Sequence, residues 1–115
     1  MLHRILVLLL LLSPPVAAWA ADFVPGTEDV PVMKGLKPVT DSAVVFDKPQ
    51  GRIVEAQFHG KLGRRQVEDF YAATLPQLGW KSGAADSWQR EDETLHLEFT
   101  GRDGDLKVGF TLSPH

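Results

Sequence analysis

Cysteine is absent from this 115-residue sequence. Its absence excludes disulfide cross-links, thiolate nucleophiles and the cysteine ligands of structural zinc sites. It also excludes the lipid-modified cysteine by which bacterial lipoproteins are tethered to a membrane. A small domain without such cross-links must be held together by the apolar side chains that it buries.

A block of charge of one sign is also absent. Twelve Lys and Arg residues stand against fifteen Asp and Glu residues, which gives a formal net charge of −3 at pH 7. The two signs are mixed along the chain, whereas a nucleic-acid surface needs clustered Lys and Arg. The pattern therefore argues against nucleic acid as a partner and, more weakly, against anionic lipid headgroups.

Sequence motifs of catalysis are missing as well. The chain has no G-x-S-x-G or S-x-x-K motif around a serine, and no P-loop, G-x-G-x-x-G or H-E-x-x-H motif. The acidic segments 91–93 and 101–105 lack the spacing of a calcium loop and are interpreted as hairpin turns. We therefore predict that the protein is not an enzyme and has no catalytic, cofactor or metal site.

Two histidines lie within the predicted strands. His59 and His96 alternate with apolar residues and are expected on one polar sheet face with Glu55 and Glu98. Such a group could bind zinc or copper if the strand order brought it together. No pair has the spacing of a helical metal site, so we interpret both histidines as solvated surface residues.

The first twenty residues are the most distinctive feature that the sequence does contain. They have a positive start, an apolar run and a small-residue cleavage site: Met1–Arg4, Ile5–Leu12 and Ala18–Ala20. These are the parts of a secretory signal peptide, and the run is shorter than the roughly 20 residues that span a bilayer. We expect a signal peptide over residues 1–20, cleavage between Ala20 and Ala21, and a periplasmic or secreted protein with no membrane span thereafter.

An arm, residues 21–41, follows the signal peptide. Its prolines and glycines prevent a regular helix and hinder strand pairing. Between them stand four apolar residues that are candidates for contact with a partner: Val30, Val32, Met33 and Leu36. The arm is expected to be extended, and its apolar side chains either lie on the domain, or dock on a partner, or are disordered. We expect residues 42–115 to form the α+β domain and to fold without the arm.

Hydrophobic periodicity locates the elements of that domain. Segments 42–46 and 54–58 read as a hairpin with a longer loop around the Pro49–Gly51 turn signal. After residue 80, strands at 87–90, 94–99 and 106–112 form a meander with alternating apolar and polar residues.

Between hairpin and meander, residues 62–80 have the period of an amphipathic helix. Its apolar stripe comprises Val67, Phe70, Tyr71, Leu75 and Leu78. Gly63 is the expected N-cap residue, Pro76 predicts a kink or an early loosening, and Gly79 with Trp80 predicts a Schellman ending.

One apolar helix stripe and one apolar sheet face predict a two-layer α+β sandwich. The helix packs on an antiparallel sheet, in the chain order β-β-α-β-β-β. The order of the strands within the sheet stays open. The other sheet face is expected to be wet or covered by a partner, and it carries Glu55, Gln57, His59, His96, Glu98, Lys107 and Thr111.

The helix contains the string V-x-x-F-Y-x-x-x-L-P-x-x-G-W over Val67–Trp80. With the meander that follows, this string resembles a loosely related group of small exported or lipid-anchored bacterial domains. Segments Asp29–Leu36 and Gly51–Ala56 are similar to uncharacterised exported proteobacterial proteins of comparable length. The resemblance implies a fold for most of the mature chain and no assigned activity. Many members carry a lipid-anchoring cysteine, and this chain departs from them in having none.

These observations favour an exported, non-enzymatic accessory or protein-interaction module of the bacterial cell envelope. Its expected partner is an envelope protein of unknown identity. The alternative is a periplasmic binder of a small apolar ligand, held in a groove between helix and sheet by Tyr71, Trp80 and Trp88. A cavity of about 300–1,000 Å³ would favour that alternative, and an enzyme is the third class considered.

Overall fold

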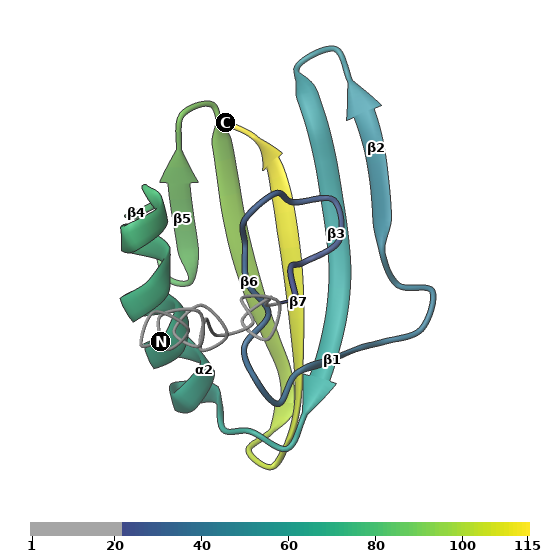
Figure 1. Cartoon of the computed structure of the whole chain (residues 1–115), viewed down its shortest axis with the longest axis vertical. Helices are drawn as coiled ribbons and strands as arrows, with labels where there is room; N and C mark the ends of the chain where they lie inside the picture. The colour runs from purple at the N-terminus through teal and green to yellow at the C-terminus, as the bar shows by residue number, and fades with distance from the viewer. Residues whose placement is uncertain (1–21) are drawn as a thin grey trace, which may run out of the picture.

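The computed structural model describes residues 22–115, and Figure 1 shows their arrangement. The expected signal peptide and its cleavage between Ala20 and Ala21 lie outside the described residues. The described chain is an α+β domain in which one short helix accompanies an antiparallel sheet. No helix within residues 22–115 has the length and apolar character that a bilayer crossing requires.

A seven-stranded antiparallel sheet makes up most of this domain. Its strands are β1 (Lys37–Pro38), β2 (Val44–Lys48), β3 (Gly51–Gly60), β4 (Lys81–Ser82), β5 (Ser87–Arg90), β6 (Glu93–Arg102) and β7 (Asp105–Pro114). Across the sheet the order is β1-β3-β7-β6-β5-β4, and β2 also pairs with β3. The last strand of the chain therefore lies in the middle of the sheet, as Figure 1 shows.

The expected chain order, β-β-α-β-β-β, is wrong by two strands. β1 arises within the arm and pairs with the end of β3, and β4 follows the helix and pairs with β5. Each has only two residues, which is too short for an alternating pattern to be visible in the sequence. Pro38 fits in β1 because an edge strand needs no N–H donor on its free side.

The hairpin of β2 and β3 is also tighter than expected. Pairing continues to Lys48 and Gly51, so the loop is only Pro49–Gln50 rather than a longer one. Asp47 and Lys48 resemble a turn in the sequence because they are charged. They belong to an exposed edge strand, where charged side chains are well tolerated.

The helix loosens at Pro76, as the sequence predicts. Helix α2 (Arg64–Thr74) gives way to the 3-10 helix η2 (Leu75–Leu78) one residue before Pro76. A proline has no N–H to donate and its ring crowds the preceding turn, so the regular α-helix stops there. The loosening predicted at this point is therefore confirmed.

The ending of η2 is a Schellman motif, as predicted. Gly79 has φ of 94°, in the left-handed region that favours glycine. The N–H of Gly79 donates to Pro76 O at 3.1 Å, and the N–H of Trp80 donates to Leu75 O at 3.1 Å. These two bonds satisfy carbonyl groups that the end of a helix leaves without partners.

The start of α2 is capped from a distant part of the chain. Gly63 is the N-cap residue but has no side chain to accept a hydrogen bond. The carboxylate of Asp103, in the turn between β6 and β7, accepts the N–H of Arg64 at 2.9 Å. The side chain of Gln66 accepts the N–H of Gly63 at 3.3 Å. The β6–β7 turn thus supplies the cap that glycine lacks.

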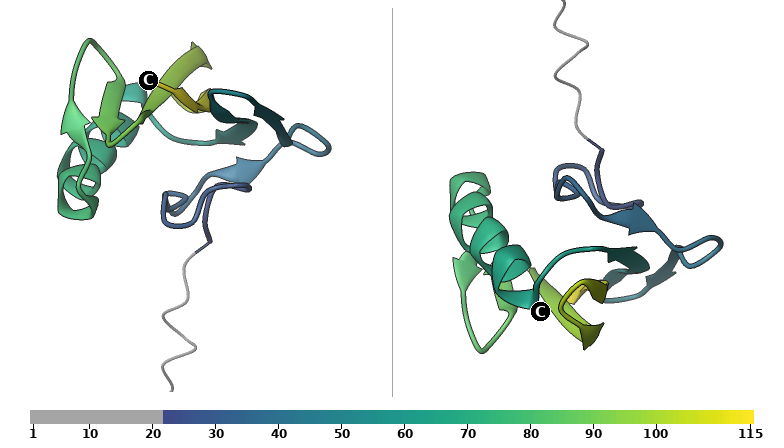
Figure 2. Two further views of the ribbon diagram at one scale, coloured as in Figure 1. Left: turned by 90° about the horizontal axis from the view of Figure 1, so that it is seen from above. Right: turned by 90° about the horizontal axis from the view of Figure 1, so that it is seen from below.

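Helix and arm together cover one face of the sheet, which we call the inner face. Figure 2 shows them side by side on this face, with the helix towards β5 and the arm towards β3. Both contribute to the buried core. Its members are Val24, Val30, Leu36, Val54, Ala56, Phe58, Val67, Tyr71, Leu75, Trp80, Trp88, Leu95, Leu97, Leu106, Val108, Phe110 and Leu112.

The opposite, outer face of the sheet is polar, as the alternation predicted. Glu55, Gln57, His59, His96, Glu98 and Lys107 are exposed there, and Thr111 is half-buried. At the centre of this face, Gly109 lies between Gln57 and Glu98. A Cβ atom on Gly109 would meet the Gln57 amide at 2.9 Å, so the Gln57 side chain lies across this position.

Candidate functional site

The three aromatic residues predicted to line a ligand groove are core residues. Tyr71, Trp80 and Trp88 are all buried. A cleft of about 310 Å³ does lie between α2 and the β4–β5 segment, and Tyr71 and Trp88 form part of its wall. Trp80 does not line it, so the three rings do not form one surface.

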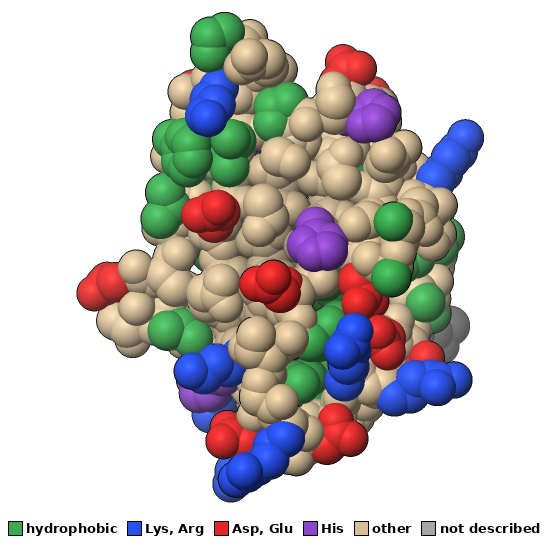
Figure 3. All heavy atoms as spheres, turned by 180° about the vertical axis from the view of Figure 1, so that it is seen from behind, with side chains coloured by type: hydrophobic (Ala, Val, Ile, Leu, Met, Phe, Trp, Pro, Cys, Tyr) green, Lys and Arg blue, Asp and Glu red, His purple; other side chains and the backbone are tan. Residues whose placement is uncertain are grey.

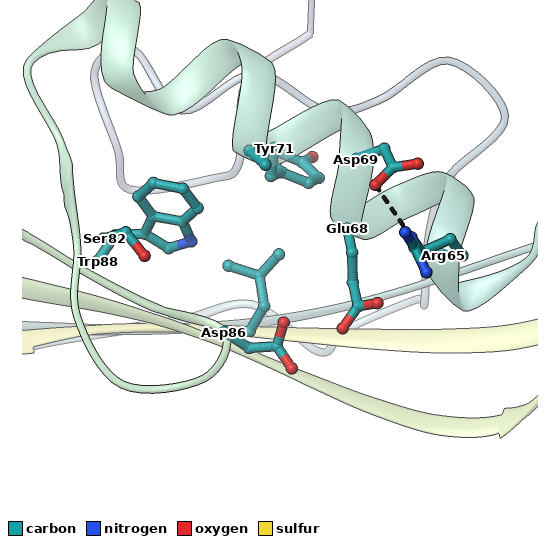
Figure 4. Close-up of a pocket in the computed structure, with 9 residues that line it drawn as sticks. Arg65, Glu68, Asp69, Tyr71, Ser82, Asp86 and Trp88 are labelled. Carbon is teal, nitrogen blue, oxygen red and sulfur yellow. Dashed lines mark hydrogen bonds and ion pairs between the residues drawn. The ribbon is translucent and has the colours of Figure 1, made fainter.

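The rim of this cleft is charged, as Figure 4 shows. Glu68, Asp69 and Asp86 line it together with Arg65, which pairs with Asp69 at 3.3 Å. Arg64 lies nearby and bridges Glu68 at 3.3 Å and Asp86 at 3.2 Å. Such a rim is hydrated, whereas an apolar ligand needs a mostly apolar pocket.

The phenol of Tyr71 has a structural role instead. Its hydroxyl donates to Pro31 O at 2.7 Å and accepts the Met33 N–H at 3.1 Å. Burial raises the pKa of this phenol well above its ordinary range, against a smaller lowering by the Met33 hydrogen bond. The phenol therefore stays neutral and ties the helix to the arm.

The four arm residues predicted to contact a partner differ in how deeply they are buried. Val30 and Leu36 are 1% and 7% exposed and belong to the core. Val32 and Met33 are half-buried against it. The Val30 side chain is therefore out of reach of any partner. Val32 and Leu36 line, with Phe23, a groove of about 300 Å³.

An ion pair and a further hydrogen bond hold the arm on the domain. Arg90 of β5 forms two hydrogen bonds with the Asp29 carboxylate, at 2.8 and 3.2 Å, and a third with Leu78 O. Its guanidinium also stacks 4.3 Å from the centre of the Trp80 ring. Arg52 donates to Gly26 O at 2.8 Å. The arm is thus fixed at several points rather than free to dock elsewhere.

The histidines of the outer face are not brought together. His59 of β3 pairs with Lys107 of β7, and His96 of β6 pairs with Thr111 of β7. Strand β7 therefore lies between the two histidines, and their partners on it are four residues apart. The His96 Nδ1 atom lies 2.9 Å from Ser87 Oγ. Within residues 22–115 no cluster of three metal-ligating side chains occurs.

Sequence reasoning missed the most unusual surface, the edge strand β2. Val44, Val45 and Phe46 are 45%, 52% and 40% exposed, and all five residues of β2 are exposed. Val44 and Phe46 pair with Glu55 and Ile53 on the outer face. Figure 3 shows apolar side chains gathered at the upper left of that face. An apolar run in a sequence predicts a buried strand, and nothing in its letters shows that this one has a single neighbour.

The backbone of β2 is open along its outer side. Among the described residues, β2 pairs with β3 alone. In an antiparallel ladder, alternate residues direct their N–H and C=O groups to opposite sides of the strand. The outward groups of β2 therefore form a template for a further strand.

Comparison of the chain with protein-family models, with curated proteins and with solved structures finds no match.

Proposed function

We propose that this chain is an exported, non-enzymatic interaction module of the bacterial cell envelope that binds its partner by strand addition at β2. The observation that carries the proposal is the combination of an unpaired strand edge with three exposed apolar side chains on that same strand. Native sheets usually shorten, charge or cover such edges. Here the edge is left open over five residues.

The support for export is the signal-peptide anatomy of residues 1–20. An exported module with no catalytic constellation acts by contact. Strand addition gives such a contact two components. Backbone hydrogen bonds provide affinity, and pockets or patches for alternate side chains provide specificity.

The surface fits an extended segment of another polypeptide better than a second copy of this chain. Full-length antiparallel self-pairing of β2 would centre on Phe46. It would place Val44 opposite Lys48 of the other copy and Val45 opposite Asp47, so each charged side chain would face an apolar one. The complementary segment has apolar residues opposite Val44–Phe46 and a carboxylate opposite Lys48.

The test is site-specific cross-linking in the exported, full-length chain. A photo-reactive phenylalanine at position 46 replaces an exposed ring with a similar one, so it disturbs the fold little. The control carries the same probe at Gln89, which is exposed on β5 between two paired strands. We expect a discrete adduct with another polypeptide from position 46 and none from position 89.

A second variant separates specific from random adducts. Val44→Lys adds a charge to the outer-face side of β2, where Val44 lies opposite the exposed Glu55. It should abolish the adduct while leaving the melting temperature within a degree or two. Adducts with only twice the mass of the chain would show self-pairing and overturn the proposal. Absence of any adduct, or one that survives Val44→Lys, would overturn it too.

A further inference from the structure

A basic cluster lies at the opposite end of the sheet from the β2–β3 loop. Three of the six lysines of the chain gather there: Lys37, Lys61 and Lys107. Figure 3 shows blue side chains at the lower end of the outer face. None of these lysines forms an ion pair with any part of residues 22–115, whereas Arg52, Arg64, Arg65 and Arg90 all do.

Strand register sets the spacing of this cluster. Lys37 of β1 pairs directly with His59 of β3, and His59 pairs directly with Lys107 of β7. Neighbouring strands lie about 4.7–4.9 Å apart, so the two lysines are held roughly 10 Å from each other on the same face of the sheet. The imidazole of His59 lies between them.

A hollow of about 500 Å³ adjoins this row. Lys37, His59 and Lys61 line it, together with Asp105. Three glycines complete the wall, at positions 35, 60 and 104. A Cβ atom on Gly60 would collide with the carbonyl oxygen of Gly35, so this close backbone approach requires glycine. The close backbone approach brings the arm against the end of β3, at the wall of the hollow.

We propose that this hollow binds a phosphate group, with Lys37 and Lys61 on either side of it and His59 donating from a ring N–H. Lys37 and Lys61 line the hollow against the single Asp105 carboxylate, and Lys107 lies beside it, opposite His59. Together the three lysines leave an excess of two positive charges, which matches the −1.5 to −2 charge of a phosphate monoester at about pH 7. A carboxylate ligand would offset only one of them.

The site is invisible in the sequence because its cations lie far apart along the chain. The mixed charge signs argued against nucleic acid and, more weakly, against anionic lipid headgroups. The fold nevertheless collects lysines from β1, from the residue after β3 and from β7. The site is also separate from the β2 edge, so each proposal can fail without the other.

The test is titration of the protein with inorganic phosphate at constant ionic strength, followed by amide chemical shifts. We expect saturable shifts confined to residues around positions 37, 59 and 61. The double variant Lys37→Gln/Lys61→Gln should weaken binding at least tenfold. Lys48→Gln/Lys81→Gln is the matched control, because it removes the same charge from two exposed lysines outside the cluster, and it should bind as the parent does.

A second arm distinguishes free phosphate from a lipid headgroup. Flotation with phosphatidylglycerol vesicles is compared with flotation on phosphatidylcholine vesicles for the same three proteins. Saturable phosphate shifts without flotation assign a soluble ligand, and flotation that requires Lys37 and Lys61 assigns a headgroup. The proposal is overturned if neither probe binds, or if the two double variants behave alike.

Discussion

The helix and the arm cover the same face of one sheet, but they satisfy their backbones by different means. Helix α2 satisfies its own N–H and C=O groups along its length. The arm relies on scattered bonds, such as Val24 N–H to Val30 O and Val32 N–H to Asp22 O, both 2.9 Å. Yet Val24 and Val30 are as deeply buried as Tyr71 of the helix. An irregular segment can therefore serve as a packing layer when turns and partner side chains satisfy its polar groups.

Removal of the arm is the most severe test of this comparison. Deletion of residues 22–36 should abolish cooperative folding, because it exposes the β3 half of the inner face and removes Val24, Val30 and Leu36 from the core. This reverses the expectation that the domain folds alone. Circular dichroism melts and amide spectra of the truncated chain measure it. An unchanged melting curve would show that the arm is an appendage.

Truncation of Tyr71, the residue that links helix α2 to the arm, should have the next largest effect. Tyr71→Ala should destabilise the domain by about 3–5 kcal/mol, in the range measured for large buried aromatic residues. Phe70→Ala is the matched comparison and should cost clearly less. Phe70 has a central place in the apolar stripe of the sequence, but it is only half-buried, whereas Tyr71 packs edge-on to Phe110 in the core. Denaturant titration of both variants ranks them, and the reverse ranking would contradict this placement.

Removal of only the Tyr71 hydroxyl measures what the hydrogen bonds between the helix and the arm contribute to stability. Tyr71→Phe should lose about 1–3 kcal/mol, because the Met33 N–H and Pro31 O lose their partner. It should also change the alkaline limit of stability. The raised pKa means that the folded state keeps the phenolic proton, so stability is fully present below about pH 10 and falls as pH rises above it.

That alkaline limit can be followed directly, because Tyr71 is the only tyrosine of the chain. Ultraviolet absorbance of the phenolate should appear together with unfolding and not before it. Tyr71→Phe should lose this component of the pH dependence. Phenolate absorbance in a protein that is still folded near pH 10 would contradict the buried, neutral phenol.

A smaller effect is expected at the ion pair that fixes the other end of the arm. Arg90→Lys keeps the charge but loses the two-point contact with Asp29, so we expect a loss of about 1 kcal/mol. Asp29→Asn should have a similar effect. Thermal melts of both single variants and the double variant measure the coupling. Strictly additive losses would show that the pair does not hold the arm.

The smallest effect is expected on the outer face, which neither the helix nor the arm covers. His59→Ala and His96→Ala should change the free energy of unfolding by no more than about 0.5 kcal/mol, as is usual for exposed sites. Chelators should leave the melting temperature unchanged. Stoichiometric zinc or copper that is lost with either substitution would show a metal site and contradict this prediction.

The helix could be predicted in detail because its determinants are local. The stripe spacing, Pro76 and Gly79 each act within one or two turns, and the structure follows them. The meander is similar, since its strands are joined by tight turns. The polar outer face follows from the same alternation.

What could not be predicted depends on residues distant in the sequence. The Asp103 cap of α2 spans 39 positions, and the Tyr71 bond to Pro31 spans 40. The exposure of β2 and the gathering of lysines depend on strand order, which a single sequence does not specify. The prolines of the arm correctly exclude a helix, but they do not exclude burial.

The central position of β7 has a consequence for how the domain is made. Within residues 22–115, β7 follows every other strand in the sequence, and it alone joins β3 to β6. A nascent chain that does not yet contain β7 has two sheet fragments with no shared neighbour, so the sheet cannot close before β7 has been synthesised. Pairing across such long sequence separations is also slow. For a chain destined for export, as we propose, this topology postpones closure of the domain until β7 has been made.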